Sequence, residues 1–326
     1  MTPADLIRAT LAGERTPRPP YSFWTHFPGT DLDPEALAAA SISFAEATRI
    51  DLIKAMPNGF YCVEDWGVIA DYSEIAAGGV ARVVQSPIAA AEDWSRIGRL
   101  DVRAGALGRE LTHLARLVAA AGPERPVLAT VFSPLTIAKK LCPEGFNGYV
   151  ARDPGRVTAA LEAIAATTRA FASEAIALGC AGVFFAVQDA VPSVGMDRYA
   201  ELGRRYDLAV LDGAAGGWCN AVHLHGEEVL FDAVADYPVH VLNWHIGETE
   251  PSIAAYRAAG GSKAVLGGLR RSNLTRADFA GLAEDIAAAA AADGARGVIF
   301  APGCVIRHPC DLTVLGRVAA LLRGQA

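Results

Sequence analysis

The chain has 326 residues, of which 52% are hydrophobic and 20% are charged, and its formal net charge is −7. This composition supports a sizeable core and is ordinary for a folded protein. A nucleic-acid-binding surface needs clustered positive charge, so the acidic balance and the lack of a basic run exclude one. The longest apolar stretches are alanine-rich and interrupted by charged residues, which makes them too short to span a bilayer.

The N-terminal residues and the cysteines indicate the cellular setting. Residues 1–20 mix acidic and basic side chains and contain no apolar segment of signal-peptide length. The six cysteines are scattered without a CxxC pair, in a chain too long to need disulfide staples. We therefore expect a soluble, cytoplasmic protein whose cysteines are mostly reduced.

Along the chain, short β-branched or aromatic runs alternate with longer stretches of helical periodicity. The expected strands are 21–27, 59–66, 126–132, 182–188, 220–225, 239–245, 264–269 and 297–302. One expected helix opens at Asp33, because aspartate caps helices and Pro34 suits the first helical position. The other expected helices are 105–121, 154–178, 197–213, 250–259 and 275–293.

Eight strand–helix units in about 300 residues predict an α/β fold, a (β/α)₈ TIM barrel formed by residues 1–326 as a single domain. The alternative is a doubly wound parallel sheet. No Pro/Gly/Ser-rich linker divides the chain. Segment 67–100 contains several β-prone residues, and we predict that it forms a hairpin or lid inserted after strand two.

Polar side chains gather where the predicted strands end, which is where barrels of this type place their active sites. The N-terminal ends of the same strands are apolar or small. In chain order the polar strand ends carry Tyr61, Glu64 and Asp65; Gln188 and Asp189; His223 and His225; Asn243, Trp244 and His245; Arg270 and Arg271; and Cys304.

His223 and His225 are two positions apart on a predicted strand, so both imidazoles point to one face. Zinc suits imidazole and thiolate ligands together, and catalytic zinc sites use three protein ligands with one position open. Cys304 could supply the third ligand. Alternatively, the histidines are a polar strand end bonded to backbone or solvent, and Cys304 is a small buried hydrophobe.

The other candidates also have two interpretations each. His245 could act as a general acid or base, or could satisfy a loop carbonyl. Glu64 could be catalytic or could face a helix, and Arg270 could bind an anion or form a solvated ion pair. The predicted substrate-binding residues, some of which could instead fill the barrel, are Trp24, Tyr61, Gln188, Asn243, Trp244 and Arg270.

The motifs HLHGEE, VLNWH, GGLRRSNL and IFAPGCVI occur in this order in the last third of the chain. They resemble the uroporphyrinogen decarboxylase superfamily. The decarboxylases of that superfamily carry an arginine-rich stretch after the first strand, which grips propionate carboxylates. The corresponding stretch of this chain, YSFWTHFPGTDLDPE, contains no arginine, so a tetrapyrrole with many carboxylates is a poor substrate.

The resemblance is closer to the second branch, the zinc-dependent methyltransferases that move a methyl group between a corrinoid protein and a thiol such as coenzyme M. That branch binds zinc with a His-x-Cys pair and a later cysteine. His223 and Cys304 match this pattern, whereas His225 stands where the family has cysteine. Replacing thiolate by neutral imidazole raises the net charge of the site by one and makes the zinc a harder Lewis acid.

The resemblance implies a methyltransferase or demethylase in which zinc at His223, His225 and Cys304 activates an acceptor. Glu64 or His245 would handle a proton, and the methyl donor would be a corrinoid on a partner protein or a small methylated metabolite. A metal-independent decarboxylase or lyase with a carboxylate at Arg270 remains an alternative, as does a barrel that binds a ligand without catalysis. The expected partner is a small-molecule substrate, with no nucleic acid or membrane; a homodimer is left open.

Overall fold

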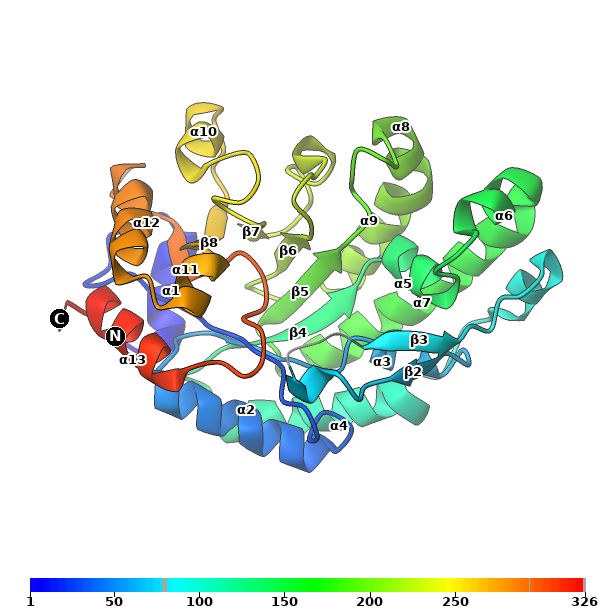
Figure 1. Cartoon of the computed structure of the whole chain (residues 1–326), viewed down its shortest axis with the longest axis horizontal. Coiled ribbons are helices and arrows are strands. Elements are labelled where there is room, and N and C mark those ends of the chain that lie inside the picture. Colours follow the sequence, from blue (N-terminus) through cyan, green and yellow to red (C-terminus); the bar gives the residue numbers. More distant parts are fainter. Residues whose placement is uncertain (78–80, 293, 325–326) are drawn as a thin grey trace.

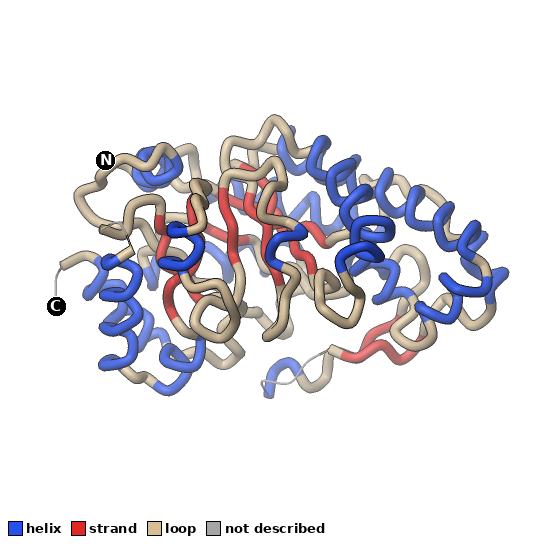
Figure 2. Tube along the Cα trace, turned by 90° about the horizontal axis from the view of Figure 1, so that it is seen from above, coloured by secondary structure: helices blue, strands red, loops and turns tan. Residues whose placement is uncertain are grey.

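A seven-stranded parallel sheet curls through the centre of the molecule, and helices cover its outer face (Figures 1 and 2). The computed structural model describes residues 1–77, 81–292 and 294–324. Each strand pairs in parallel with the strand that follows it along the sheet. In sheet order the strands are β1 (Ile53–Lys54), β4 (Val127–Phe132), β5 (Gly182–Val187), β6 (Ala221–Leu224), β7 (Val241–Asn243), β8 (Ala264–Leu269) and β9 (Val298–Pro302). This is a TIM-like α/β architecture.

The predicted strands from 126–132 onward are confirmed, with boundaries that differ by a few residues. They are nearly continuous hydrophobic runs because helices cover them on one face and the interior of the curled sheet on the other. The longer helices are α1 (Pro3–Leu11), α2 (Pro34–Thr48), α4 (Gly105–Ala121), α5 (Pro134–Leu141), α7 (Pro154–Ala177), α9 (Arg205–Gly213), α12 (Phe279–Ala291) and α13 (Leu312–Leu322). Helix α2 packs against α4, and α7 packs against α9 (Figure 1).

Shorter helical segments lie mostly between these elements. Two predicted helices are interrupted. The helix predicted at 197–213 contains a π-helical turn, and the one predicted at 275–293 is divided between α11 and α12. Position 293 lies outside the described residues. The short segments are α3 (Tyr61–Glu64), α6 (Phe146–Arg152), α8 (Met196–Tyr199), α10 (Ile253–Ala258), α11 (Arg271–Arg276), the 3₁₀ helices η1 (Ile75–Ala77), η2 (Ala91–Arg96) and η4 (Phe231–Ala233), and the π-helical turn η3 (Ala200–Arg204). No helix among the described residues has the length and apolar character to cross a membrane.

The predicted first strand, 21–27, is present only as two isolated bridges, from Tyr21 to Phe300 and from Thr25 to Ile306. In this segment a side-chain hydroxyl adds to the few backbone hydrogen bonds: Thr25 Oγ1 donates to the carbonyl of Ile306 at 2.8 Å. The backbone N–H of Asp51 donates to the carbonyl of Tyr21 at 2.9 Å. This segment therefore contacts both β9 and the chain that leads into β1.

The predicted second strand, 59–66, is wrong. Tyr61–Glu64 is the helix α3, and the strand lies earlier, at β1. Pro57 has no N–H for a ladder, and Asn58 Oδ1 accepts a hydrogen bond from the N–H of Phe60 at 2.9 Å, which turns the chain. The aromatic residues that suggested a strand, Phe60, Tyr61 and Trp66, are nevertheless buried.

Between α3 and α4 lies a two-stranded antiparallel hairpin, β2 (Ile69–Asp71) and β3 (Arg82–Gln85), at the edge of the molecule (Figure 1). It falls within the segment 67–100 for which we predict an insertion, of which residues 78–80 lie outside the described residues.

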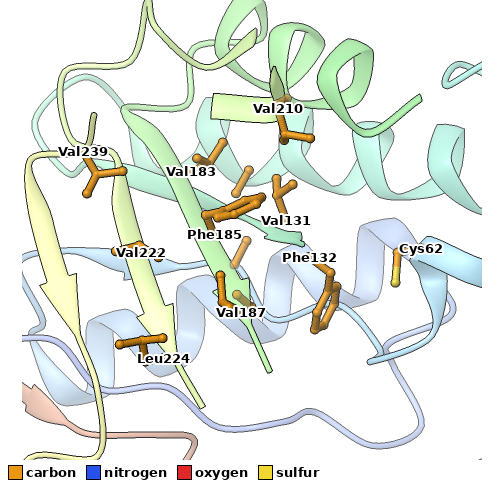
Figure 3. Close-up of a cluster of buried hydrophobic side chains, with 14 of the residues drawn as sticks. Cys62, Val131, Phe132, Val183, Phe185, Val187, Val210, Val222, Leu224 and Val239 are labelled. Carbon is orange, nitrogen blue, oxygen red and sulfur yellow. The ribbon is translucent and has the colours of Figure 1, made fainter. Parts of the chain in front are cut away.

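Side chains alternate between two apolar layers along the sheet. The outward side chains, among them Val183, Phe185 and Val222, pack under the helices (Figure 3). The inward side chains form a second cluster that includes Phe184 and Ala221. Because strand side chains alternate with a period of two, the residues at 223 and 225 face inward with Ala221. The same register therefore places polar groups at the carboxyl ends of the strands above an apolar floor.

Candidate metal centre

Three histidines and one cysteine converge at the carboxyl ends of three strands. His223 lies near the end of β6 and His225 follows that strand; His245 follows β7, and Cys304 follows β9. One ligand atom from each of the four lies within 4.8 Å of the others. The side chains of His223, His245 and Cys304 are buried, and His225 is partly exposed. The three residues that we predict as ligands thus lie together, with His245 as a fourth neighbour.

Asn243 fixes the orientation of His223. The Nδ2 group of Asn243 donates to the carbonyl of Leu266, so its Oδ1 accepts from Nδ1 of His223. With the proton on Nδ1, the lone pair of His223 is on Nε2. Nε2 lies 3.9 Å from Sγ of Cys304. This is the support that metal-ligating histidines receive from a partner outside the ligand set.

The other two imidazoles lie around the same sulfur. Nδ1 of His225 is 3.5 Å from Sγ of Cys304. Nδ1 of His245 is buried without a hydrogen-bond partner among the described residues, and it lies 3.6 Å from Oε2 of Glu248. Burying a polar atom without a hydrogen-bond partner destabilises the folded state by about 1–3 kcal/mol. A ligand that bound this nitrogen of His245 would remove that penalty.

A glycine allows the cysteine to approach the histidines. A Cβ atom at Gly303 would lie 2.7 Å from Cα of His245 and 2.8 Å from the carbonyl oxygen of Trp244. Such contacts are too short for any side chain, so the chain after β9 can pass this point only because residue 303 is glycine. The next residue, Cys304, is thereby brought against the ends of β6 and β7.

Burial sets the protonation states of the cluster. It lowers the pKa of His223 well below its usual value, with the neighbouring His225 and His245 adding to the effect. It also lowers the pKa of His225, and it lowers that of His245 to about 4. Burial raises the pKa of the Cys304 thiol. Neutral imidazoles are the form that binds metals, and a three-nitrogen, one-sulfur donor set suits zinc.

The cluster lines a cavity of about 510 Å³, a volume typical of small-molecule sites. Trp24, Gln188 and the four cluster residues line it, while Asn243 lies behind His223. Aromatic side chains from neighbouring elements form an apolar wall: Trp24, Phe60, Phe132 and Phe184. The cavity therefore combines an apolar wall with a small number of polar groups.

Two residues that we predict as functional, Glu64 and Tyr61, lie outside this cavity lining. Both are on α3 and not at the end of a strand. Glu64 forms an ion pair with Arg109, whose Nη2 lies 2.8 Å from Oε1. The hydroxyl of Tyr61 donates to the carbonyl of Thr130 at 2.6 Å. The misassigned strand accounts for both placements.

Trp244 and Arg270 also lie outside the cavity lining. Trp244 alternates with Asn243 and His245, so it points outward, where its Nε1 donates to the carbonyl of Pro251 at 2.8 Å. Nε of Arg270 donates to Oδ1 of Asp285 at 2.6 Å. The neighbouring Arg271 lines the cavity instead.

Sequence reasoning missed Lys54 and Lys140, which both line the cavity. Lys54 belongs to β1, a strand of two residues that the predicted elements do not contain. The available signal was a single lysine inside the apolar run DLIKAM.

An α/β fold with a curled parallel sheet and a cavity at the carboxyl ends of its strands defines a TIM-like protein. The model of the family described as Uroporphyrinogen decarboxylase (URO-D) matches residues 2–323. The chain therefore belongs to the uroporphyrinogen decarboxylase family. No curated protein matches its sequence.

Several solved structures share the fold. A methyltransferase from Methanosarcina mazei has a TM-score of 0.82 at 15% identity, covering 100% of this chain and 99% of that chain. A putative vitamin-B12 independent methionine synthase from Listeria monocytogenes has a TM-score of 0.59 at 12% identity, covering 89% and 86%. A B12-independent methionine synthase from a Shewanella species has a TM-score of 0.53 at 14% identity, covering 94% and 92%. At these identities the similarity shows the fold.

Proposed function

We propose that this protein is a zinc-dependent methyltransferase or demethylase that moves a methyl group between a corrinoid or a small methylated metabolite and an acceptor. The observation that carries the proposal is the convergence of His223, His225 and Cys304 on one cavity. Family membership and the fold shared with the methyltransferase from Methanosarcina mazei support it.

The donor atoms would be Nε2 of His223, Nδ1 of His225 and Sγ of Cys304. Zinc held there would act as a Lewis acid that lowers the pKa of an acceptor group. Asn243 orients His223, and burial keeps the imidazoles neutral at physiological pH. Trp24 and Gln188 would contact the substrate from the cavity wall. Tyr61, Trp244, Glu64 and Arg270 have no part in this arrangement.

His245 would either move a proton or complete the ligand set. A pKa of about 4 makes it a weak proton acceptor at neutral pH, which favours the ligand role. Its position within 4.8 Å of the other ligand atoms supports the same role. A four-residue set would leave no open position until the acceptor replaced a ligand or the coordination number increased.

We further infer that residues 1–326 are one domain, a closed (β/α)₈ barrel in which 20–25 takes the place of the first strand and 67–100 is an insertion. The hydrogen bonds of Tyr21 and Ser22 to both sheet edges support closure. A cytoplasmic location, a corrinoid protein as partner and a homodimer stay predictions.

Elemental analysis of protein grown with zinc and never exposed to chelator tests the metal centre. We expect about one zinc per chain in the wild type and less than about a tenth in a His223→Ala, Cys304→Ser double variant. The matched control is Cys310→Ser, because Cys310 lies outside the four-residue cluster. A metal-free wild type, or full occupancy in the double variant, would contradict the proposal. Methyl transfer from a methylated corrinoid is then measured on the loaded protein.

A metal-independent decarboxylase or lyase of a small acid is the second candidate. The cationic lysine and arginine side chains around the cavity favour it, since they would hold a carboxylate without a metal. Turnover that survives complete removal of zinc would establish this function over the first.

A further inference from the structure

The chain has only four lysines, and two of them, Lys54 and Lys140, line the cavity that holds the histidine–cysteine cluster. Lys54 lies in β1 and is only 9% exposed, and Lys140 is partly buried near the end of α5. Among the described residues, neither forms an ion pair with a carboxylate. The adjacent Lys139 does, with Asp189 at 2.6 Å.

The side chains packed against Nζ of Lys54 are uncharged, although the acidic groups Cys304 and Glu110 favour its charged form electrostatically. Its Nζ lies 4.7 Å from the centroid of the Phe184 ring, 6.0 Å from that of Trp24, and 2.8 Å from Sδ of Met56. Aromatic faces attract a cation, but they do not replace a counter-ion when the cation is taken out of water. Burial lowers the pKa of Lys54 to about 7. The fold therefore holds this amine where its charged form is disfavoured until an anion arrives.

The charges around the cavity are unbalanced, and their sign is opposite to the net charge of the whole chain. Of the described residues, one carboxylate, Glu227, and four lysine or arginine side chains line the cavity: Lys54, Lys140, Arg271 and Arg307. Of these four, Arg271 has a carboxylate partner, Glu248, at 3.4 Å. A concave site with excess positive charge attracts anions, even in a protein whose net charge is −7.

We propose that Lys54 is the specificity-determining residue of the cavity and binds the anionic group of a small organic acid, with Lys140 contributing a second positive charge. The proposal rests on the proposed function only in taking this cavity as the substrate site. The ring of Phe184 lies between Lys54 and the histidine–cysteine cluster, because it also stacks on the imidazole of His223 with centroids 5.1 Å apart. An acid only a few carbon atoms long could therefore contact Lys54 and reach the cluster.

Two probes of nearly equal shape test the charge preference: phenylacetate and its neutral amide, phenylacetamide. Each is titrated by calorimetry, at about pH 6 and below the pKa of Lys54, into protein purified from cells grown with zinc and never exposed to chelator. We expect the wild type to prefer the acid by about ten- to a hundredfold, the range for a hydrogen bond between charged groups. Lys54→Met should abolish the preference, and Lys54→Arg should restore much of it.

Lys263→Met is the matched control, because Lys263 does not line the cavity and its loss should leave the preference unchanged. Equal binding of acid and amide by the wild type, no binding of the acid, or a preference that survives Lys54→Met would overturn the proposal. Zinc content is measured on the same samples. If the wild type binds zinc but does not prefer the acid, only the inference about Lys54 is contradicted. If the wild type contains no zinc but prefers the acid, only the proposed metal centre is contradicted.

Discussion

The two sides of the cavity differ in the kind of ion that they suit. On one side, His223, His225, His245 and Cys304 bring nitrogen and sulfur donor atoms together, and Asn243 orients His223. On the other, Lys54 is a buried amine packed against aromatic rings. One side of the cavity is therefore suited to a metal cation and the other side to the anionic group of a small acid. Substitutions confined to one side should leave the other side unchanged.

The largest effect is expected for Cys304→Ser. If the binding free energy of zinc, about 10–16 kcal/mol, is shared among a few ligands, loss of the thiolate weakens binding by about a thousandfold or more. Competition with a chromophoric chelator measures the affinity. The acid-over-amide preference should remain, because Lys54 is untouched. Unchanged zinc affinity would remove Cys304 from the ligand set.

Lys54→Met should stabilise the protein in the absence of ligand, by at most about 5 kcal/mol at pH 6. Burial lowers the pKa of Lys54 from its ordinary 10.5 to about 7 in the folded state, so the penalty of burying the charged amine is complete below pH 7. The penalty fades as pH rises from 7 towards 10.5, because the folded state can then lose the proton that the unfolded state keeps. Urea unfolding at pH 6 and at pH 9 should show a smaller gain at the higher pH. A destabilised variant at pH 6 would mean that Lys54 already has a compensating partner.

Asn243→Leu tests the support of the metal side. The variant leaves Nδ1 of His223 unpaired and frees the ring to present the wrong nitrogen. Loss of such a partner costs about 10- to 100-fold in metal affinity. The control is Asn147→Ala, since Asn147 is exposed and is not part of the cavity lining. An affinity equal to that of the wild type would show that packing alone orients His223.

Zinc binding should release one proton from the protein, and its pH dependence should show this. Burial lowers the pKa of all three histidines, that of His245 to about 4 and that of His223 well below its usual value, so these rings are neutral above about pH 6. The thiol of Cys304, whose pKa burial raises, must lose its proton to bind. Affinity should then rise about tenfold per pH unit between roughly pH 6 and 8. A slope of two or more protons would mean that the histidines are protonated in the free protein.

The convergence of His223, His225 and Cys304 could be predicted from the sequence because a few residues encode it locally. A strand alternates its side chains strictly, so the spacing of His223 and His225 gives their common direction without any knowledge of the fold. The contribution of Cys304 needed only the strand order of a barrel and the resemblance. The role of Asn243 towards His223 was not predictable, because it depends on the register between β6 and β7.

The lysine side could not be predicted because its strand is two residues long. Residues 59–66 are richer in aromatic residues than the run around Lys54, so the sequence pattern favoured the wrong segment. Pro57 and the turn at Asn58 decide the structure there, and they displaced Glu64 and Tyr61 from the expected strand end. Alternation then explains why Trp244, between two inward residues, points away from the cavity.

The smallest effect is expected for Glu64→Gln. Glu64 is bound to Arg109 through two contacts of 2.8 and 2.9 Å, and both side chains are about one-quarter exposed. An ion pair of this kind contributes up to about 1 kcal/mol, so the variant should lose no more stability than that. Zinc content and acid preference should not change, because Glu64 does not line the cavity.

Glu248→Gln is the matched variant for Glu64→Gln. The carboxylate of Glu248 lies 3.6 Å from Nδ1 of His245, and its loss should alter zinc affinity. If Glu64→Gln instead lowered turnover by about a hundredfold with zinc retained, the size expected for loss of a general acid or base, Glu64 would regain a role in proton transfer.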